Sequence, residues 1–243
     1  SKGPATLPDN GPGTPHAVVA FAQGAARVPV DRTKYSTLRT LEELDSWVAK
    51  GFGAGVVAFD TETTGLDCMR AELVGFSLAV APNEACYVPL AHTAGSGDLF
   101  GGGGLAPGQV DLREALSRLK PLLEDPGVLK VAQNGKYDAL LLSRYGIAVA
   151  PIDDTMLISY ALDGGKGSHG MDTLSERHLG HVCIAFDKVI EHAAGAKKAD
   201  KTFAGVPIDK ATEYAAEDAD VALRLWRSLK PRLPAEGMTT VYE

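Results

Sequence analysis

The sequence predicts an α/β fold in which a mixed central sheet is flanked by helices. Val56 to Phe59 is an apolar run without alternation, which is typical of a strand buried on both faces. Residues 73–80 and 85–90 form two short apolar runs parted by Pro82-Asn83, a pattern that indicates an antiparallel hairpin beside that strand. Helical spacings and short apolar runs then alternate toward the C-terminus, which favours helices packed against a sheet.

The bulk composition is that of a globular protein, with 45% hydrophobic and 23% charged residues in 243. No apolar run reaches the length of a membrane span, and no signal segment opens the chain. The three cysteines are scattered without metal-ligand spacing, so we expect reduced thiols and a cytoplasmic setting. The net charge of −7 argues against a nucleic-acid partner unless several acids are metal ligands, because bound cations invert the local sign.

The N-terminal residues 1–30 are rich in Pro, Gly and Ala and are predicted to be a flexible arm or interdomain linker, which leaves 31–243 as the domain. Because the chain begins with Ser and stops without an obvious closing element, we expect a fragment of a longer protein. A helix is expected over 38–50, opened by a capping box of Thr40 and Glu43 and ended by the glycines at 51, 53 and 55.

The remaining elements follow from periodicity and from Gly and Pro positions. The loop 94–108, with glycines at 101–104, is expected to be exposed and mobile, and the segment 188–201 is expected to be irregular and basic. We expect strands at 128–132 and 147–150, and helices at 111–123, 136–145, 153–162, 171–179 and 208–229.

Asp60 and Glu62 stand at the end of the central strand. Alternate residues of an extended chain point to the same side, so the two carboxylates are expected to share one face. Burying like charges together is unfavourable unless a cation neutralises them. The pattern therefore favours a metal site, and the alternative is a pair of solvated turn carboxylates.

Two later segments add acids. Asp138 begins a helix that leaves a strand, where α/β sheets gather ligands, although an acid also favours any helix start. Tyr214 and Asp218 are four residues apart and are expected to share a helix face, with small alanines allowing a close approach. Glu217 is expected to point away toward solvent or a surface partner. The alternative is an ordinary amphipathic helix with an acidic outer face.

Together, Asp60, Glu62, Asp138 and Asp218 carry four formal negative charges, which two divalent cations would balance. Oxygen ligands without His or Cys suit Mg²⁺ or Mn²⁺. Two such ions about 4 Å apart promote in-line phosphoryl displacement. Tyr214 is a neutral phenol near neutral pH, so it suits the orientation of a water molecule. The predicted chemistry is metal-assisted phosphodiester hydrolysis.

Several motifs resemble one known family. Asp60-x-Glu62, Asn134-x-x-Tyr137-Asp138 and Tyr214-x-x-x-Asp218 occur in the order and spacing of DEDD exonucleases of the Tyr subclass. More narrowly, the region from about 56 to 229 resembles the 3′→5′ proofreading exonuclease domains of bacterial DNA polymerase I. The resemblance also rests on the segments 131–138, 154–157, 171–174 and 214–220.

The resemblance implies an RNase H-like fold and metal-dependent hydrolysis of single-stranded or frayed DNA 3′ ends to nucleoside 5′-monophosphates. It implies a polymerase domain of the same parent chain as the partner, and a monomeric state. The implied roles are metal ligation by Asp60, Glu62, Asp138 and Asp218, water orientation by Tyr214, wedging against terminal bases by Leu66 and Phe186, and sugar or phosphate contacts by Thr63, Gln133, Asn134 and Tyr137.

The sequence departs from the family pattern at one position, and two other functions remain alternatives. Ser168 stands where the family often has Arg, and lysines in the segment 191–205 are candidates to replace that contact. Two alternatives to the proofreading nuclease are an RNA 3′→5′ exonuclease of the ribonuclease D type and a catalytically inactive RNase H-like scaffold. All four acids of the family pattern are present, so we expect activity.

Overall fold

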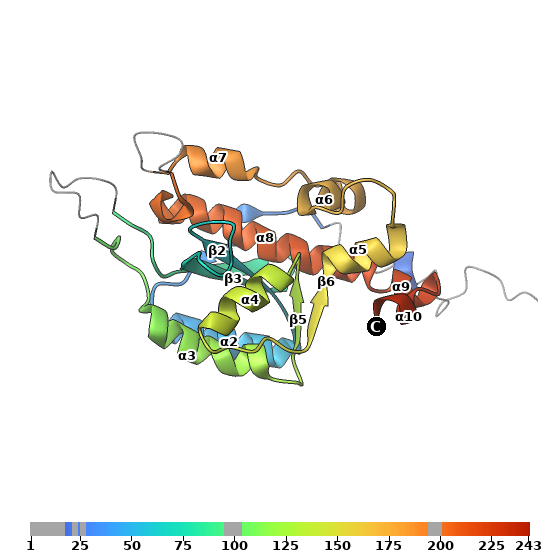
Figure 1. Ribbon diagram of the computed structural model, residues 1–243, viewed down its shortest axis with the longest axis horizontal. Coiled ribbons are helices and arrows are strands. Elements are labelled where there is room, and N and C mark those ends of the chain that lie inside the picture. The colour runs from blue at the N-terminus through green and yellow to red at the C-terminus, as the bar shows by residue number, and fades with distance from the viewer. Residues whose placement is uncertain (1–17, 21–23, 25–27, 95–103, 194–200) are drawn as a thin grey trace, which may run out of the picture.

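The computed structural model describes residues 18–20, 24, 28–94, 104–193 and 201–243. Its centre is a mixed sheet of six strands in the order β1-β4-β3-β2-β5-β6, with helices on both faces (Figure 1). The predicted fold class is therefore confirmed. In this described part of the chain, no helix is long and apolar enough to cross a membrane. The strands are β1 (Ser36–Thr37), β2 (Val56–Thr63), β3 (Leu73–Ala81), β4 (Glu84–Pro89), β5 (Leu129–Ala132) and β6 (Ile152–Asp154).

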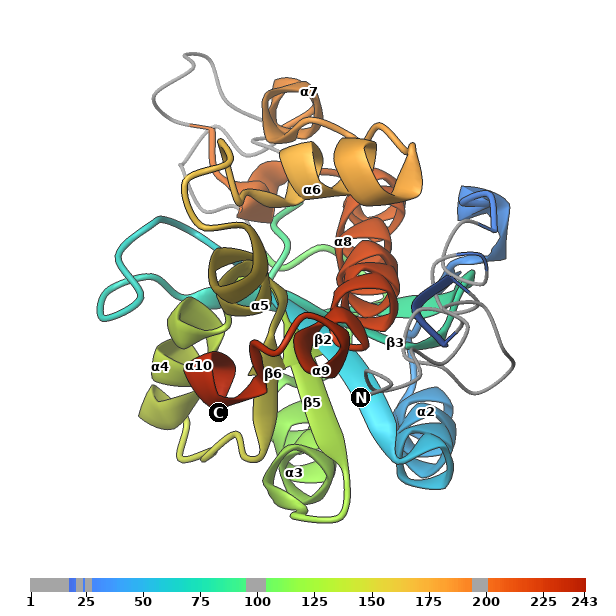
Figure 2. The same cartoon turned by 90° about the vertical axis from the view of Figure 1, so that its right-hand side faces the viewer.

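The helices form two layers. On one face of the sheet lie α2 (Leu41–Ala54) and α3 (Leu112–Glu124), and on the other lies α8 (Ile208–Leu229), as Figure 1 shows. Figure 2 shows α6 and α7 on the outer side of α8. The remaining elements are α4 (Lys136–Arg144), α5 (Thr155–Asp163), α6 (Met171–Leu179), α7 (Phe186–Glu191), α9 (Arg232–Ala235), α10 (Thr239–Tyr242) and the 3-10 turns η1 (Arg32–Lys34) and η3 (Phe203–Gly205).

The central strand is β2, as its uninterrupted apolar run predicts. It pairs antiparallel with β3 and parallel with β5, and Val57, Ala58 and Phe59 are buried. The hairpin of β3 and β4 is confirmed, and Asn83 in its turn has a φ of 64°. Because β2 has strands on both sides and helices on both faces, the acids at its end are held by a rigid support.

Small residues set the distance between α8 and the sheet. Ala216, Ala219 and Ala222 of α8 pack in one cluster with Ala58 of β2 and Ala79 of β3. Side chains of this size let a helix backbone approach a sheet closely, as the sequence predicts for the alanines of this segment. The close approach brings the middle of α8, which carries Asp218, to the acids at the end of β2.

The capping box of α2 is confirmed, but the helix is longer than expected. The Thr40 hydroxyl accepts from the Glu43 amide, and the helix then continues through Gly51 to a left-handed end at Gly55, with a φ of 69°. A Cβ at Gly51 would lie 2.9 Å from a Leu122 methyl carbon of α3. The glycine therefore permits close packing of two helices and does not end the first.

Two other expectations were wrong. Residues 147–150 are not a strand, because Ile147 and Val149 pack into the core without strand pairing and β6 follows at Ile152–Asp154 instead. The segment 188–201, expected to be irregular, contains most of α7. Val189 and Ile190 of this helix are buried in one cluster with Ala211 and Ala215 of α8. Residues 1–17, Gly101–Gly103, Lys197 and Lys198, named in the predictions for the arm and the two loops, lie outside the described residues.

Candidate active site

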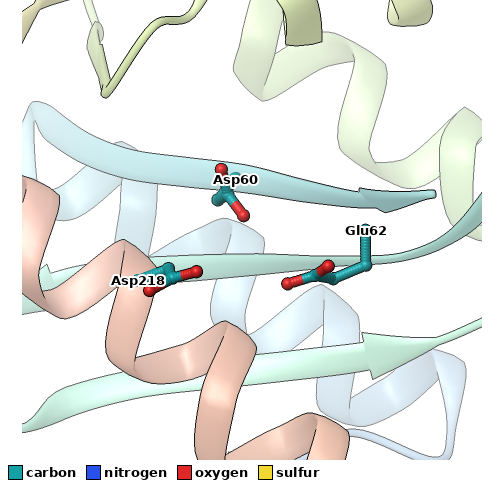
Figure 3. A group of neighbouring side chains, drawn as sticks. All are labelled: Asp60, Glu62 and Asp218. Atoms are coloured by element: carbon teal, nitrogen blue, oxygen red, sulfur yellow. The ribbon is translucent and has the colours of Figure 1, made fainter. Parts of the chain in front are cut away.

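Three carboxylates meet where β2 ends and α8 passes over it. Asp60 and Glu62 project from the same side of β2, and Asp218 reaches toward them from α8 (Figure 3). One oxygen from each of the three lies within 4.8 Å of the others. The strand alternation that predicts a shared face for Asp60 and Glu62 is confirmed, and the helix supplies the third acid.

The electrostatics of this group favour a cation. Burial raises the pKa of Asp60, Glu62 and Asp218 well above their ordinary values, and the other carboxylates raise it further for Asp60 and Glu62. Glu62 is only 6% exposed, and its buried Oε1 has no hydrogen-bond partner among the described residues. A buried acceptor without a donor, facing two other acids, has the chemistry of a hard divalent-cation site, so these residues fit such an ion.

The fourth predicted ligand, Asp138, lies beside this group. It is buried in the first turn of α4, and its Oδ1 accepts hydrogen bonds from the amide and the hydroxyl of Thr61. Burial raises the pKa of Asp138 to about 7 against the lowering effect of those bonds. Its charge also raises the pKa of Asp60. Thr61 was not among the predicted site residues. Strand alternation directs its side chain away from Asp60 and Glu62, and there it meets Asp138.

Tyr214 adjoins the carboxylates one turn before Asp218 on α8. It lines the same cavity as Asp218, and its ring lies 6.2 Å from that of Phe186 and 6.0 Å from that of Phe203 between centroids. Burial, followed by the charge of Asp218, raises the pKa of Tyr214 far above its usual range. The side chain is therefore a neutral phenol that can orient a water molecule and cannot act as its base.

A cavity of about 540 Å³ opens over these groups. Two of the apolar side chains in its lining are exposed: Leu66 is 97% exposed and Phe186 is 50% exposed. Exposed apolar side chains at the rim of a polar cavity are suited to stacking or wedging against a base. The cavity is lined by Asp60, Thr61, Glu62, Thr63, Thr64, Gly65, Leu66, Asn134, Tyr137, Phe186, Ile190, Lys201, Thr202, Phe203, Tyr214 and Asp218.

The four polar residues predicted to touch substrate have different surroundings. Asn134 is exposed in the cavity lining, with a φ of 59°. The hydroxyls of Thr63 and Tyr137 lie 2.7 Å apart, and both are within 2.9 Å of the Gly65 carbonyl oxygen, so they also hold the turn that carries Leu66.

Gln133 is set apart from the cavity lining. Its side-chain amide donates to the His169 carbonyl at 2.8 Å and accepts from the Thr155 hydroxyl, so both ends of the amide have protein partners. Ser168, at the position where an Arg was expected from the resemblance, lines a smaller neighbouring cavity of about 340 Å³ together with Tyr214 and Asp218.

The predicted outward orientation of Glu217 is wrong. Its side chain is buried, and its carboxylate binds Arg32, His181 and the Ile184 amide. The outer face of α8 at this point is covered by η1 and by the connection between α6 and α7, which are distant in sequence. A helical wheel places Glu217 opposite the sheet but cannot reveal that other segments cover it.

Comparisons with known proteins identify the family of the chain. A family model described as 3′-5′ exonuclease matches residues 35–234. The chain is 59% identical over 233 residues to DNA polymerase I of Rhizobium leguminosarum, a match that covers 92% of the chain and 22% of that relative. It is 41% identical over 220 residues to DNA polymerase I of Pseudomonas aeruginosa, covering 89% and 23%. The chain thus spans about a fifth of the length of these relatives.

Solved structures share the fold at low sequence identity. Escherichia coli RNase D, an exoribonuclease involved in structured RNA processing, is similar with a TM-score of 0.62 at 18% identity, over 86% of this chain and 47% of that one. Brucella melitensis NrnC with bound Mg²⁺ gives a TM-score of 0.57 at 22% identity, over 86% and 84%. These likenesses confirm the expected RNase H-like fold.

Proposed function

The chain belongs to the 3′-5′ exonuclease family, and from that premise we propose that it hydrolyses single-stranded or frayed DNA 3′ ends to nucleoside 5′-monophosphates. The observation that carries the proposal is the group of Asp60, Glu62 and Asp218, whose oxygens lie within 4.8 Å of one another under an open cavity. An arrangement of buried acids beside an orienting phenol suits phosphodiester hydrolysis.

We propose that Asp60, Glu62 and Asp218, with Asp138 beside them, hold two divalent cations, Mg²⁺ or Mn²⁺. When bound, such ions supply Lewis-acid stabilisation of the attacking and leaving oxygens of the phosphoryl group. Support comes from the unpartnered Oε1 of Glu62 and from the Mg²⁺-bound structure of a protein with the same fold. The backbone and hydroxyl of Thr61 fix the orientation of Asp138.

The side chains around the acids orient the water and contact the substrate. The Tyr214 hydroxyl, in the cavity lining one helical turn from Asp218, orients the water whose oxygen forms the new bond to phosphorus as the bond to the 3′ oxygen breaks. Leu66 and Phe186 receive the terminal bases on their exposed surfaces. Asn134, Thr63 and Tyr137 are placed to contact sugar or phosphate. Gln133 supports the site from inside the protein, given its two protein partners.

The proposed biological role is proofreading. The relatives with the highest identity quoted above are DNA polymerases I, of which this chain corresponds to about a fifth, so we propose a polymerase domain of the same parent protein as partner. We further propose that the unit is a monomer and acts in the cytoplasm. An RNA 3′ end is the second candidate substrate, because the fold is shared with Escherichia coli RNase D.

The test is digestion of matched DNA and RNA oligonucleotides labelled at the 5′ end, with Mg²⁺, with Mn²⁺ and with EDTA. We expect a DNA ladder that shortens by one nucleotide at a time from the 3′ end and requires a cation. Faster digestion of RNA than of DNA would show that RNA is the preferred substrate and would favour the RNA exonuclease. No cleavage of either by folded protein would favour an inactive scaffold.

A further inference from the structure

The buried carboxylate of Glu217 joins parts of the chain that are far apart in sequence. Its Oε1 accepts from the Arg32 guanidinium, at 2.8 Å from Nε and 2.6 Å from Nη2, and from His181 Nε2 at 2.7 Å. Its Oε2 accepts from the Ile184 amide at 2.7 Å. Both oxygens of a fully buried side chain are therefore satisfied. We call Arg32, His181, Glu217 and the Ile184 amide the Glu217 clamp.

The clamp attaches one wall of the catalytic cavity to α8. Residues 180–185 connect α6 to α7 without regular structure, and His181 and Ile184 belong to this connection. It leads directly into Phe186, the first residue of α7, whose ring faces the cavity and packs at 6.2 Å from Tyr214. A shift of the connection would therefore move Phe186 relative to Tyr214.

Arg32 has a particular place in the clamp. It precedes residues 35–234, the part that the exonuclease family model matches, and belongs to the short turn η1. Two of its nitrogens bind one carboxylate oxygen, and Nη2 also lies 3.4 Å from the Val182 carbonyl oxygen. Without Arg32, the Glu217 charge would lose a cationic partner inside the protein, which is strongly unfavourable for a buried carboxylate.

We propose, building on the exonuclease function above, that Arg32 is a positioning residue for the 3′-terminal nucleotide. Arg32 neutralises Glu217, Glu217 holds the connection 180–185, and the connection sets the place of Phe186 against the terminal base. Arg32 itself touches no reacting group. Its loss therefore weakens substrate binding more than the chemical step, because none of the clamp's bonds is made to Asp60, Glu62 or Tyr214.

The kinetic test compares Arg32→Ala, Arg32→Lys and Phe186→Ala on a single-stranded DNA oligonucleotide, with Lys34→Ala as the matched control from the same turn. Base stacking on an aromatic side chain is worth enough that Phe186→Ala should raise KM at least about fivefold. Arg32→Ala should raise KM about three- to tenfold with kcat within about twofold, because it displaces the stacking surface. Arg32→Lys should restore part of the loss, since it keeps the charge without the planar fork. Lys34→Ala should leave both constants unchanged.

The double variant decides whether Arg32 acts through Phe186. If it does, Arg32→Ala adds little to the KM of Phe186→Ala, whereas independent sites would give effects that multiply. Multiplying effects, or a lowered melting temperature of Arg32→Ala with an unchanged KM, would overturn the proposal. If Arg32→Ala does not fold, Arg32→Lys carries the same comparison.

Hydrogen exchange tests the clamp without any turnover. In Arg32→Ala, the amides of residues 184–191 should exchange faster than in the wild type, while those of β2 keep their protection. Unchanged exchange at 184–191 would refute the clamp alone. Failure of the wild type to release nucleotides would instead refute the exonuclease proposal, so the two failures are distinguishable.

Discussion

Replacing Glu62 by Gln should stabilise the protein without metal and remove its stabilisation by metal. At the 4.8 Å within which the three carboxylate oxygens lie, two unit charges at an effective dielectric constant of about 20 repel by about 3.5 kcal/mol. Protonation limits this cost. A Glu with an unfolded pKa of about 4.3 can be kept protonated at pH 7 for about 3.7 kcal/mol. Both figures are upper bounds, so Glu62→Gln should increase the free energy of unfolding in EDTA by less than about 3.7 kcal/mol, and on the order of 2 kcal/mol.

The sign with pH follows from the raised pKa of Glu62. The folded state binds a proton that the unfolded state has released, so the wild type loses stability as pH rises above about 4.3. The advantage of Glu62→Gln in EDTA should therefore shrink as the pH is lowered toward 4.3. In saturating Mg²⁺ or Mn²⁺ the wild type should become more stable than Glu62→Gln, because a ligand at about 100 times its Kd stabilises the protein that binds it by about 2.7 kcal/mol.

The assay is thermal unfolding of the wild type and Glu62→Gln in EDTA and in Mg²⁺ or Mn²⁺, with Glu176→Gln as the exposed control. For a chain of this size, about 2 kcal/mol corresponds to a rise in melting temperature of about 4–8 °C in EDTA. The curves should cross when the cation is added, and the control should follow the wild type. A less stable Glu62→Gln in EDTA, together with no effect of either cation on the wild type, would refute the reasoning.

Four further outcomes are expected. Asp138→Ala should keep the fold but reduce hydrolysis of a DNA oligonucleotide to background, and near-normal turnover by pure protein would exclude Asp138 from the metal site. Tyr214→Phe should lower kcat about 10-fold or more with little change in KM, because it removes only the hydroxyl that orients water; an unchanged kcat would leave Tyr214 a packing role. Burial lowers the pKa of His92 to about 4. Between pH 6.5 and 4 the unfolded state therefore takes up a proton that the folded state does not, and the stability of the protein falls as the pH is lowered. Denaturant unfolding should show wild type losing about 2 kcal/mol relative to His92→Gln between pH 7 and 4.5, and parallel curves would contradict this. Lys201→Ala should raise KM and flatten its salt dependence, since Lys201 is the one basic side chain among the described lining residues of the catalytic cavity; the same salt slope in both proteins would count against a phosphate contact.

The parts of the site that local rules govern could be predicted from the sequence. Alternation along a strand placed Asp60 beside Glu62, and helical periodicity placed Tyr214 one turn from Asp218. The orientation of Glu217 could not be predicted in the same way, because its partner Arg32 is 185 residues away. Burial of this kind depends on which distant segments cover a helix, and the helical periodicity of the sequence does not indicate them.

Other mismatches have the same origin. The run from Ile147 is apolar enough for a strand, but its side chains reach the core without pairing, while the ladder with β5 is made by Ile152–Asp154. Glycine at position 51 predicts the end of a helix, yet the helix continues there, and close packing against Leu122 of α3 favours a residue without a side chain. In both places tertiary packing overrides a local preference.

The alanine contact between α8 and the sheet links fold to chemistry. Asp218 can face Asp60 and Glu62 only because α8 approaches β2 closely, and Ala216 and Ala219 packed on Ala58 permit that approach. The same contact gathers carboxylates that repel one another in the absence of a cation, so the packing that stabilises the core also concentrates an unfavourable charge at one end of it. Burial elsewhere in the fold must offset this repulsion. The site is thus held in place by a core that would be more stable without its acids, which is the expected signature of residues kept for chemistry and not for folding.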